Sequence, residues 1–152
     1  MESTTETFVV ERELTIAAEP ETVWRLLAEP AEQSTWGGTP LDFDARPGGP
    51  FRVEVIPGHV ASGEFVEVDA PRRLVYTWGW EGGGNPVPPG SSTVAIDLEP
   101  AGDGTMLTFV HSGLPSDEAA ASHSHGWDNY LGRLAVAARG EDPGRDPFLD
   151  SM

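Results

Sequence analysis

Two histidines in the last third of the chain are the side chains whose type and placement best suit chemistry. His111 ends an alternating apolar segment, and His123 shares a helical stripe with Trp127. Such a pair, with Glu64 or Tyr76 beside it, could move protons on an aromatic, polyketide-like substrate. Spacing along the chain does not by itself bring these groups within the ~3 Å of proton transfer, so the sequence leaves open whether a reaction is catalysed.

Other catalytic and metal sites find less support. His123 and His125 form an H-x-H, but residues two apart on a helix point to nearly opposite sides, so no metal site is predicted and His125 is expected to be exposed. The chain has no cysteine and no lysine, which excludes thiolate ligands and lysine Schiff bases. It also has no phosphate-binding loop and no Ser-His-Asp signature. No cofactor is expected.

A long helix over about residues 117–139 must position His123. Ser116 is a candidate N-cap, acidic residues follow in the first turn, and Gly140 marks the end. Gly126 in the helix interior costs roughly 1 kcal/mol against Ala, which indicates close packing by a strand or a ligand. The positions that recur at three- and four-residue spacing form one face: Ala120, His123, Trp127, Tyr130, Leu131, Leu134 and Ala138.

The rest of the chain favours strands. Alternation predicts a first strand over residues 8–16, and Pro20 and Pro30 lie near the start and end of a short helix that a second short helix follows. Six strands are then expected: 41–45, 51–56, 59–68, 72–80, 91–98 and 105–112. A Gly/Pro-rich loop over 81–90 is expected to form a lid or rim. This order predicts an α+β fold in which a long helix lies across a curved antiparallel sheet.

Composition sets the limits on partners and location. The chain has 152 residues, enough for one domain with a real core, which we expect over about 8–140. The tail 141–152 is expected to be disordered, unless Phe148 folds back onto the domain or a second subunit. The formal net charge is −16, and all nine strongly basic residues are arginines. This charge argues against nucleic acid and membrane partners. We expect a cytoplasmic, bacterial protein.

Five blocks of sequence, in order, resemble the activator-of-Hsp90-ATPase-like (AHSA1-like) family of the START/Bet v 1-like (SRPBCC) superfamily. The blocks cover 20–24, 31–38, 46–51, 63–78 and 104–113, the last followed by 123–127 with the sequence His-Ser-His-Gly-Trp. The resemblance implies the helix-grip fold: a curved antiparallel sheet of about six or seven strands wrapped on a long C-terminal helix, with two short helices after the first strand. It also implies a hydrophobic cavity between sheet and helix, without naming a ligand.

Three functions follow as hypotheses. The favoured one is binding of a small hydrophobic or aromatic molecule in the cavity, without demonstrated catalysis. The second is a cyclase, aromatase or hydrolase that uses the same cavity, and the third, suggested only by the family name, is co-chaperone-like stimulation of an Hsp90-type ATPase. Homodimer formation stays open. The residues expected to line the cavity are Trp36, Phe51, Tyr76, Trp78, Phe109, His111, His123, Trp127 and Tyr130.

Overall fold

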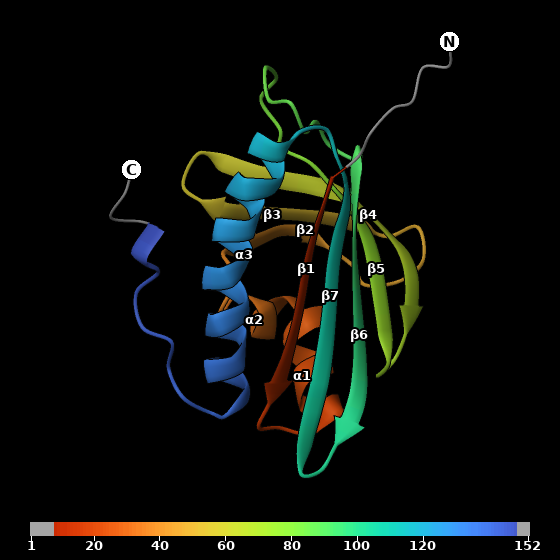
Figure 1. The fold of residues 1–152 in the computed structure, drawn as a ribbon, viewed down its shortest axis with the longest axis vertical. Helices are drawn as coiled ribbons and strands as arrows, with labels where there is room; N and C mark the ends of the chain where they lie inside the picture. The colour runs from red at the N-terminus through yellow and green to blue at the C-terminus, as the bar shows by residue number, and fades with distance from the viewer. Residues whose placement is uncertain (1–7, 149–152) are drawn as a thin grey trace.

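A seven-stranded antiparallel sheet curves around one long helix in the computed structural model, which describes residues 8–148 (Figure 1). The strands lie in the order β1-β7-β6-β5-β4-β3-β2. The fold is therefore the expected α+β helix-grip. The elements are β1 (Phe8–Ile16), α1 (Pro20–Ala28), α2 (Pro30–Gln33), β2 (Thr39–Phe43), β3 (Pro50–Ile56), β4 (His59–Asp69), β5 (Arg73–Trp78), β6 (Ser92–Ala101), β7 (Gly104–Leu114) and α3 (Asp117–Ala138).

The predicted start of the long helix is confirmed at atomic detail. The Ser116 side chain accepts a hydrogen bond from the Ala119 backbone N–H at 3.1 Å, which caps α3, and Asp117 and Glu118 occupy its first turn. The strand boundaries differ from prediction by a few residues. The largest shift is at the end of β6, which was predicted at residue 98 and lies at Ala101, because residues 99–101 still pair with β7. β2 begins at Thr39, two residues before its predicted start, because Thr39 pairs with Glu54 of β3.

The long helix is fastened along one edge of the sheet. Its backbone lies closest to β1, to β7 and to α1, whereas β2 and β3 run transverse to the helix in the view of Figure 1. Arg12 of β1 ties strand to helix, since its Nε donates to Asp128 Oδ1 at 2.6 Å and its guanidinium also donates to Ser124. The backbone of α3 is not close to β2 and β3, so side chains span the space between the helix and these strands.

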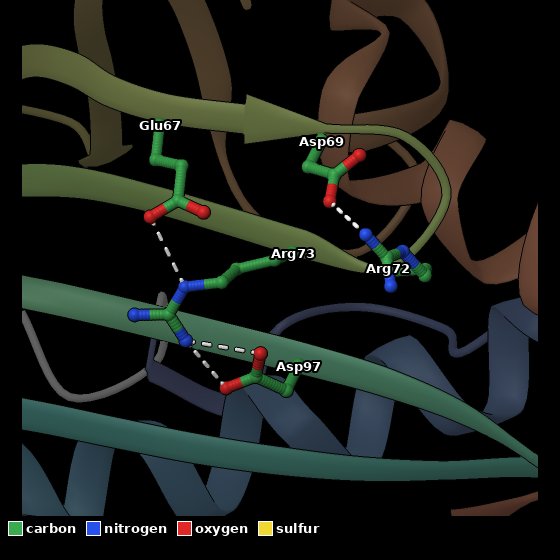
Figure 2. Close-up of polar contacts among 5 residues, drawn as sticks. All are labelled: Glu67, Asp69, Arg72, Arg73 and Asp97. Carbon is green, nitrogen blue, oxygen red and sulfur yellow. Dashed lines mark hydrogen bonds and ion pairs between the residues drawn. The ribbon is translucent and has the colours of Figure 1, made fainter.

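Most of the arginines are held in ion pairs on the surface. On the outer face of the sheet, Arg73 of β5 bridges Glu67 of β4 and Asp97 of β6, and Arg72 pairs with Asp69 (Figure 2). These side chains are at least a third exposed, so each pair contributes little stability. Within residues 8–148, at least six arginines are paired with carboxylates: Arg12, Arg46, Arg52, Arg72, Arg73 and Arg139. Within residues 8–148, no helix is long and apolar enough to cross a membrane.

The buried stripe of α3 predicts a large stability loss on truncation. We expect Leu134→Ala to lower the free energy of unfolding by about 2–5 kcal/mol, because this fully buried side chain leaves a cavity in the core. Urea unfolding measures the difference. The matched control is Leu41→Ala, whose side chain is 45% exposed and whose loss costs below about 1 kcal/mol. Equal losses in the two variants contradict the placement of this stripe.

Candidate functional site

A cavity of about 940 Å³ lies between the concave face of the sheet and α3. This volume is in the range of sites that enclose a drug-sized molecule. The wall is mainly aromatic, with four of the five tryptophans and both tyrosines. The aromatic residues that line it are Trp36, Phe43, Phe51, Tyr76, Trp78, Trp80, Trp127, Tyr130 and Phe148.

Seven of the nine residues predicted to line the cavity lie on its wall: Trp36, Phe51, Tyr76, Trp78, His123, Trp127 and Tyr130. Phe109 and His111 do not. Both are fully buried behind the wall, where β7 runs close beneath α3, and Trp127 covers them. The role of the seven lining residues in binding remains a prediction.

Stacked rings connect the sheet to the helix across the cavity wall. Phe51 of β3 stacks on Tyr76 of β5 with ring centroids 4.2 Å apart, and Trp78 contacts Trp127 of α3 at 5.1 Å. Burial alone raises the pKa of Tyr76, so its hydroxyl is neutral at physiological pH. The sheet side of the site is thus a continuous, uncharged aromatic surface.

His111 is held as one neutral tautomer by three neighbours. The indole N–H of Trp127 donates to His111 Nδ1 at 2.9 Å, so Nδ1 carries no proton and Nε2 does. Nε2 then donates to Ser92 Oγ at 2.8 Å, and that hydroxyl donates to the Trp78 carbonyl at 2.9 Å. Burial, and secondarily the nearby His123, lower the pKa of His111 to about 3.

His123 is held as the opposite tautomer. The indole N–H of Trp80 donates to His123 Nε2 at 3.0 Å, which leaves Nδ1–H to donate to the Ala119 carbonyl at 2.8 Å. Burial lowers the pKa of His123 below its ordinary value. This side chain therefore joins the loop after β5 to α3 as a neutral acceptor.

The two imidazoles lie close together but have no nitrogen available for a substrate. Their ring centroids are 5.1 Å apart and their planes nearly perpendicular, at 88°. All four nitrogens are engaged with protein partners. In this arrangement the pair organises the wall through two indole–imidazole hydrogen bonds, and it does not present an acid or a base to the cavity.

The loop between β5 and β6 forms one rim, as predicted. The backbone N–H of Trp80 donates a hydrogen bond to the Val87 carbonyl at 2.7 Å, which joins the two ends of the loop. The Val87 side chain is fully buried. Gly79 is required beneath it, because a Cβ there would lie 1.7 Å from the Pro88 carbonyl oxygen. The loop approaches the first turns of α3 at one end of the molecule (Figure 1).

The segment after α3 forms another part of the wall. Asp146 accepts hydrogen bonds from the Tyr130 hydroxyl at 2.5 Å and from Asn129 at 3.2 Å. This anchor lets Phe148 pack on Tyr130 and on the exposed His125, with ring centroids 5.7 and 5.3 Å apart. Phe148 also lies 3.9 Å from the position of a Cβ on Gly126. The described part of the tail, up to residue 148, thus runs back along the helix (Figure 1).

Two cavity-lining side chains have a buried polar atom without a hydrogen-bond partner among the described residues: Gln33 Oε1 and Trp78 Nε1. The other polar atom of Gln33, Nε2, donates to the Gly37 carbonyl at 2.7 Å. Gln33 was not among the predicted site residues. Its sequence signal is weak, because a polar residue on a four-residue helix is normally exposed.

No group of three metal-ligating side chains lies close enough to hold an ion within residues 8–148. His123 and His125 diverge, as their spacing predicted, since the first lines the cavity and the second stacks on Phe148.

Comparison with known proteins identifies relatives of the whole domain. The family model described as Activator of Hsp90 ATPase homolog 1-like protein matches residues 17–139. The solution structure of an AHSA1-like protein from Rhizobium etli is 47% identical, with 97% of this chain and 92% of that chain covered and a TM-score of 0.76.

More distant structures share the fold. CalU16 from Micromonospora echinospora is 27% identical over 95% of this chain and 80% of that chain, with a TM-score of 0.70. The Aha1 dimer from Colwellia psychrerythraea is 17% identical over 86% and 96% of the two chains, with a TM-score of 0.73, and shows the fold alone. A search of curated proteins gave no match.

The hydrogen bonds of the two histidines predict opposite neutral tautomers. In ¹⁵N-edited NMR at about pH 7.5, we expect His111 protonated only at Nε2 and His123 only at Nδ1, and His111 should keep this state down to about pH 5. The chain unfolded in urea is the control, where both rings titrate near about 6.5. A doubly protonated His111 at about pH 5 contradicts this arrangement.

The same groups predict a pH dependence of stability. Below about pH 6.5 the unfolded chain binds a proton at residue 111 that the folded chain does not bind until about pH 3. The free energy of unfolding therefore falls as pH is lowered through this window, by at most about 1.4 kcal/mol per pH unit from His111. Urea unfolding of the wild type and His111→Gln over this range measures the contribution. Parallel curves for the two proteins contradict it.

Proposed function

Because the chain belongs to the activator of Hsp90 ATPase homolog 1-like family, we propose that it binds a small hydrophobic or aromatic molecule in the cavity between the sheet and α3. The observation that carries this proposal is the aromatic wall around about 940 Å³. Burial of apolar ligand surface against such a wall yields about 25 cal/mol per Å². Tryptophan offers a large apolar area together with an N–H that can bind a polar group of the ligand, and four of the five tryptophans lie on this wall.

The polar atoms of the wall agree with a ligand that also forms hydrogen bonds. An unpaired buried donor or acceptor destabilises a protein by about 1–3 kcal/mol. Trp78 Nε1 and Gln33 Oε1 are such atoms, one a donor and one an acceptor, on residues that line the cavity. A hydroxyl on the ligand would pair with either atom, and a carbonyl would pair with Trp78 Nε1.

The enzyme hypothesis, a cyclase, aromatase or hydrolase, requires a group that gives or takes a proton. His111 and His123 were its candidates, and both have their nitrogens engaged with indole, hydroxyl and carbonyl partners. The co-chaperone hypothesis requires a surface that binds an Hsp90-type ATPase. No contact among the described residues supports such a surface. Binding without proton transfer by these histidines is therefore the function we propose.

Filling the cavity from the helix tests the proposal. We expect Gly126→Leu to weaken binding of the neutral dye Nile red at least about tenfold, because the side chain occupies ligand space. A Cβ at residue 126 meets only Phe148, and leucine favours a helix over glycine, so the variant should fold. Fluorescence titration measures affinity, and urea unfolding checks stability.

The matched control is Gly132→Leu on the same helix. Gly132 does not line the cavity, and a Cβ there meets no atom within 4 Å. This variant should bind Nile red as the wild type does. Equal affinities of the two variants place the dye outside the cavity and contradict the proposed site.

A further inference from the structure

The charges around the cavity carry an inference about the ligand, which rests on the proposed function. We propose that the cavity takes an aromatic compound that carries a protonated amine, and that it rejects the corresponding carboxylate or phosphate. Three features of the wall support this: the absence of arginine and lysine, the arrangement of the aromatic rings and the position of one carboxylate.

No arginine lines the cavity among the residues that the structure describes, and the sequence contains no lysine. Arginines on the elements around the cavity are held by protein partners, among them Arg52 of β3, which pairs with Glu81. Arg12 is paired with Asp128, and Arg133 donates to the carbonyls of Trp36, Pro143 and Gly144. An anionic ligand would therefore lose its hydration without gaining a partner of opposite charge, which is strongly unfavourable.

Aromatic faces offer a cation a favourable environment. Trp78 lies between Trp80 and Trp127, with ring centroids 5.4 and 5.1 Å away. All three line the cavity, and tryptophan gives the strongest cation–π attraction of the aromatic side chains. His123 lies beside this group but stays neutral, because its Nε2 accepts the Trp80 indole N–H. This group of side chains carries no formal positive charge, and its one unpartnered donor among the described residues is the Trp78 indole N–H.

Carboxylates complete the site at the end where the rim loop meets α3. Glu81 and Glu118 both line the cavity. Glu81 is neutralised by Arg52, to which its two oxygens are joined at 2.7 and 2.9 Å, and this ion pair holds the pKa of Glu81 below its usual range. Glu118 forms no ion pair with any described residue. It is the carboxylate that an amine at the mouth would reach.

The whole protein acts in the same direction as this site. A net charge of −16 produces a negative potential that attracts cations and repels anions before they reach the mouth. This long-range part is screened by salt, whereas contacts inside the cavity are screened much less. Salt therefore separates the two contributions.

Three ligands with one ring system test the inference: anthracenemethylamine, anthracenemethanol and anthracenecarboxylate. They differ in charge and little in shape. In salt of about 0.5 M, where remote charges are screened, we expect the amine to bind at least about tenfold more tightly than the carboxylate, with the alcohol between them. Calorimetry on the full chain measures the three affinities.

Glu118→Gln locates the selectivity. This variant should weaken amine binding about threefold or more and leave alcohol binding unchanged. Asp117→Asn is the matched control, since Asp117 is the adjacent carboxylate in the first turn of α3 and does not line the cavity. It should change neither affinity.

The outcomes separate the two proposals. A carboxylate that binds as tightly as the amine overturns the charge selection and leaves the proposed function standing. An amine preference that Asp117→Asn reduces as much as Glu118→Gln also overturns it, since general surface attraction then explains the preference. Failure of all three compounds to bind overturns the proposed function, and this inference with it.

Discussion

The attachment of α3 along one edge of a curved sheet is the constraint on which the rest of the structure depends. The helix must bury the stripe that includes Trp127, Leu131 and Leu134, and it does so against β1, β7 and α1. The right-handed twist of the sheet then carries β3–β5 away from the helix axis. Large rings span the gap that opens, and what they do not fill is the cavity.

Indole and imidazole groups hold this arrangement together where sheet and helix diverge. Trp127 reaches from α3 to His111 of β7, and His123 reaches from α3 to Trp80 of the rim loop. Each buried polar atom in these two pairs is satisfied, which is what the low dielectric of an aromatic interior demands. The histidines that first suggested acid–base chemistry are therefore explained by the assembly of the wall.

The sequence was sufficient to predict the helices and strands, but it was not sufficient to predict which residues line the cavity. Helical periodicity, the Ser116 cap and strand alternation predicted α3 and the strands, because each depends on local spacing. Alternation along the strand correctly predicted that Phe109 and His111 face the interior. It does not tell whether a helix covers an inward-facing residue, and here both are buried beneath α3 and do not line the cavity. Phe148 faces the cavity because Asp146 anchors the tail to Tyr130, a contact that no local pattern encodes.

The sheet order has a consequence for how the protein forms during synthesis. β1 precedes all other strands in the sequence, yet its neighbour β7 is the last strand, so Phe8 cannot pair with Leu114 until all seven strands have been synthesised. Pairing over such a separation is entropically costly and slow. Until α3 leaves the ribosome, the aromatic face that becomes the cavity wall is uncovered. The nascent chain thus carries this aggregation-prone apolar surface exposed until α3 has been synthesised.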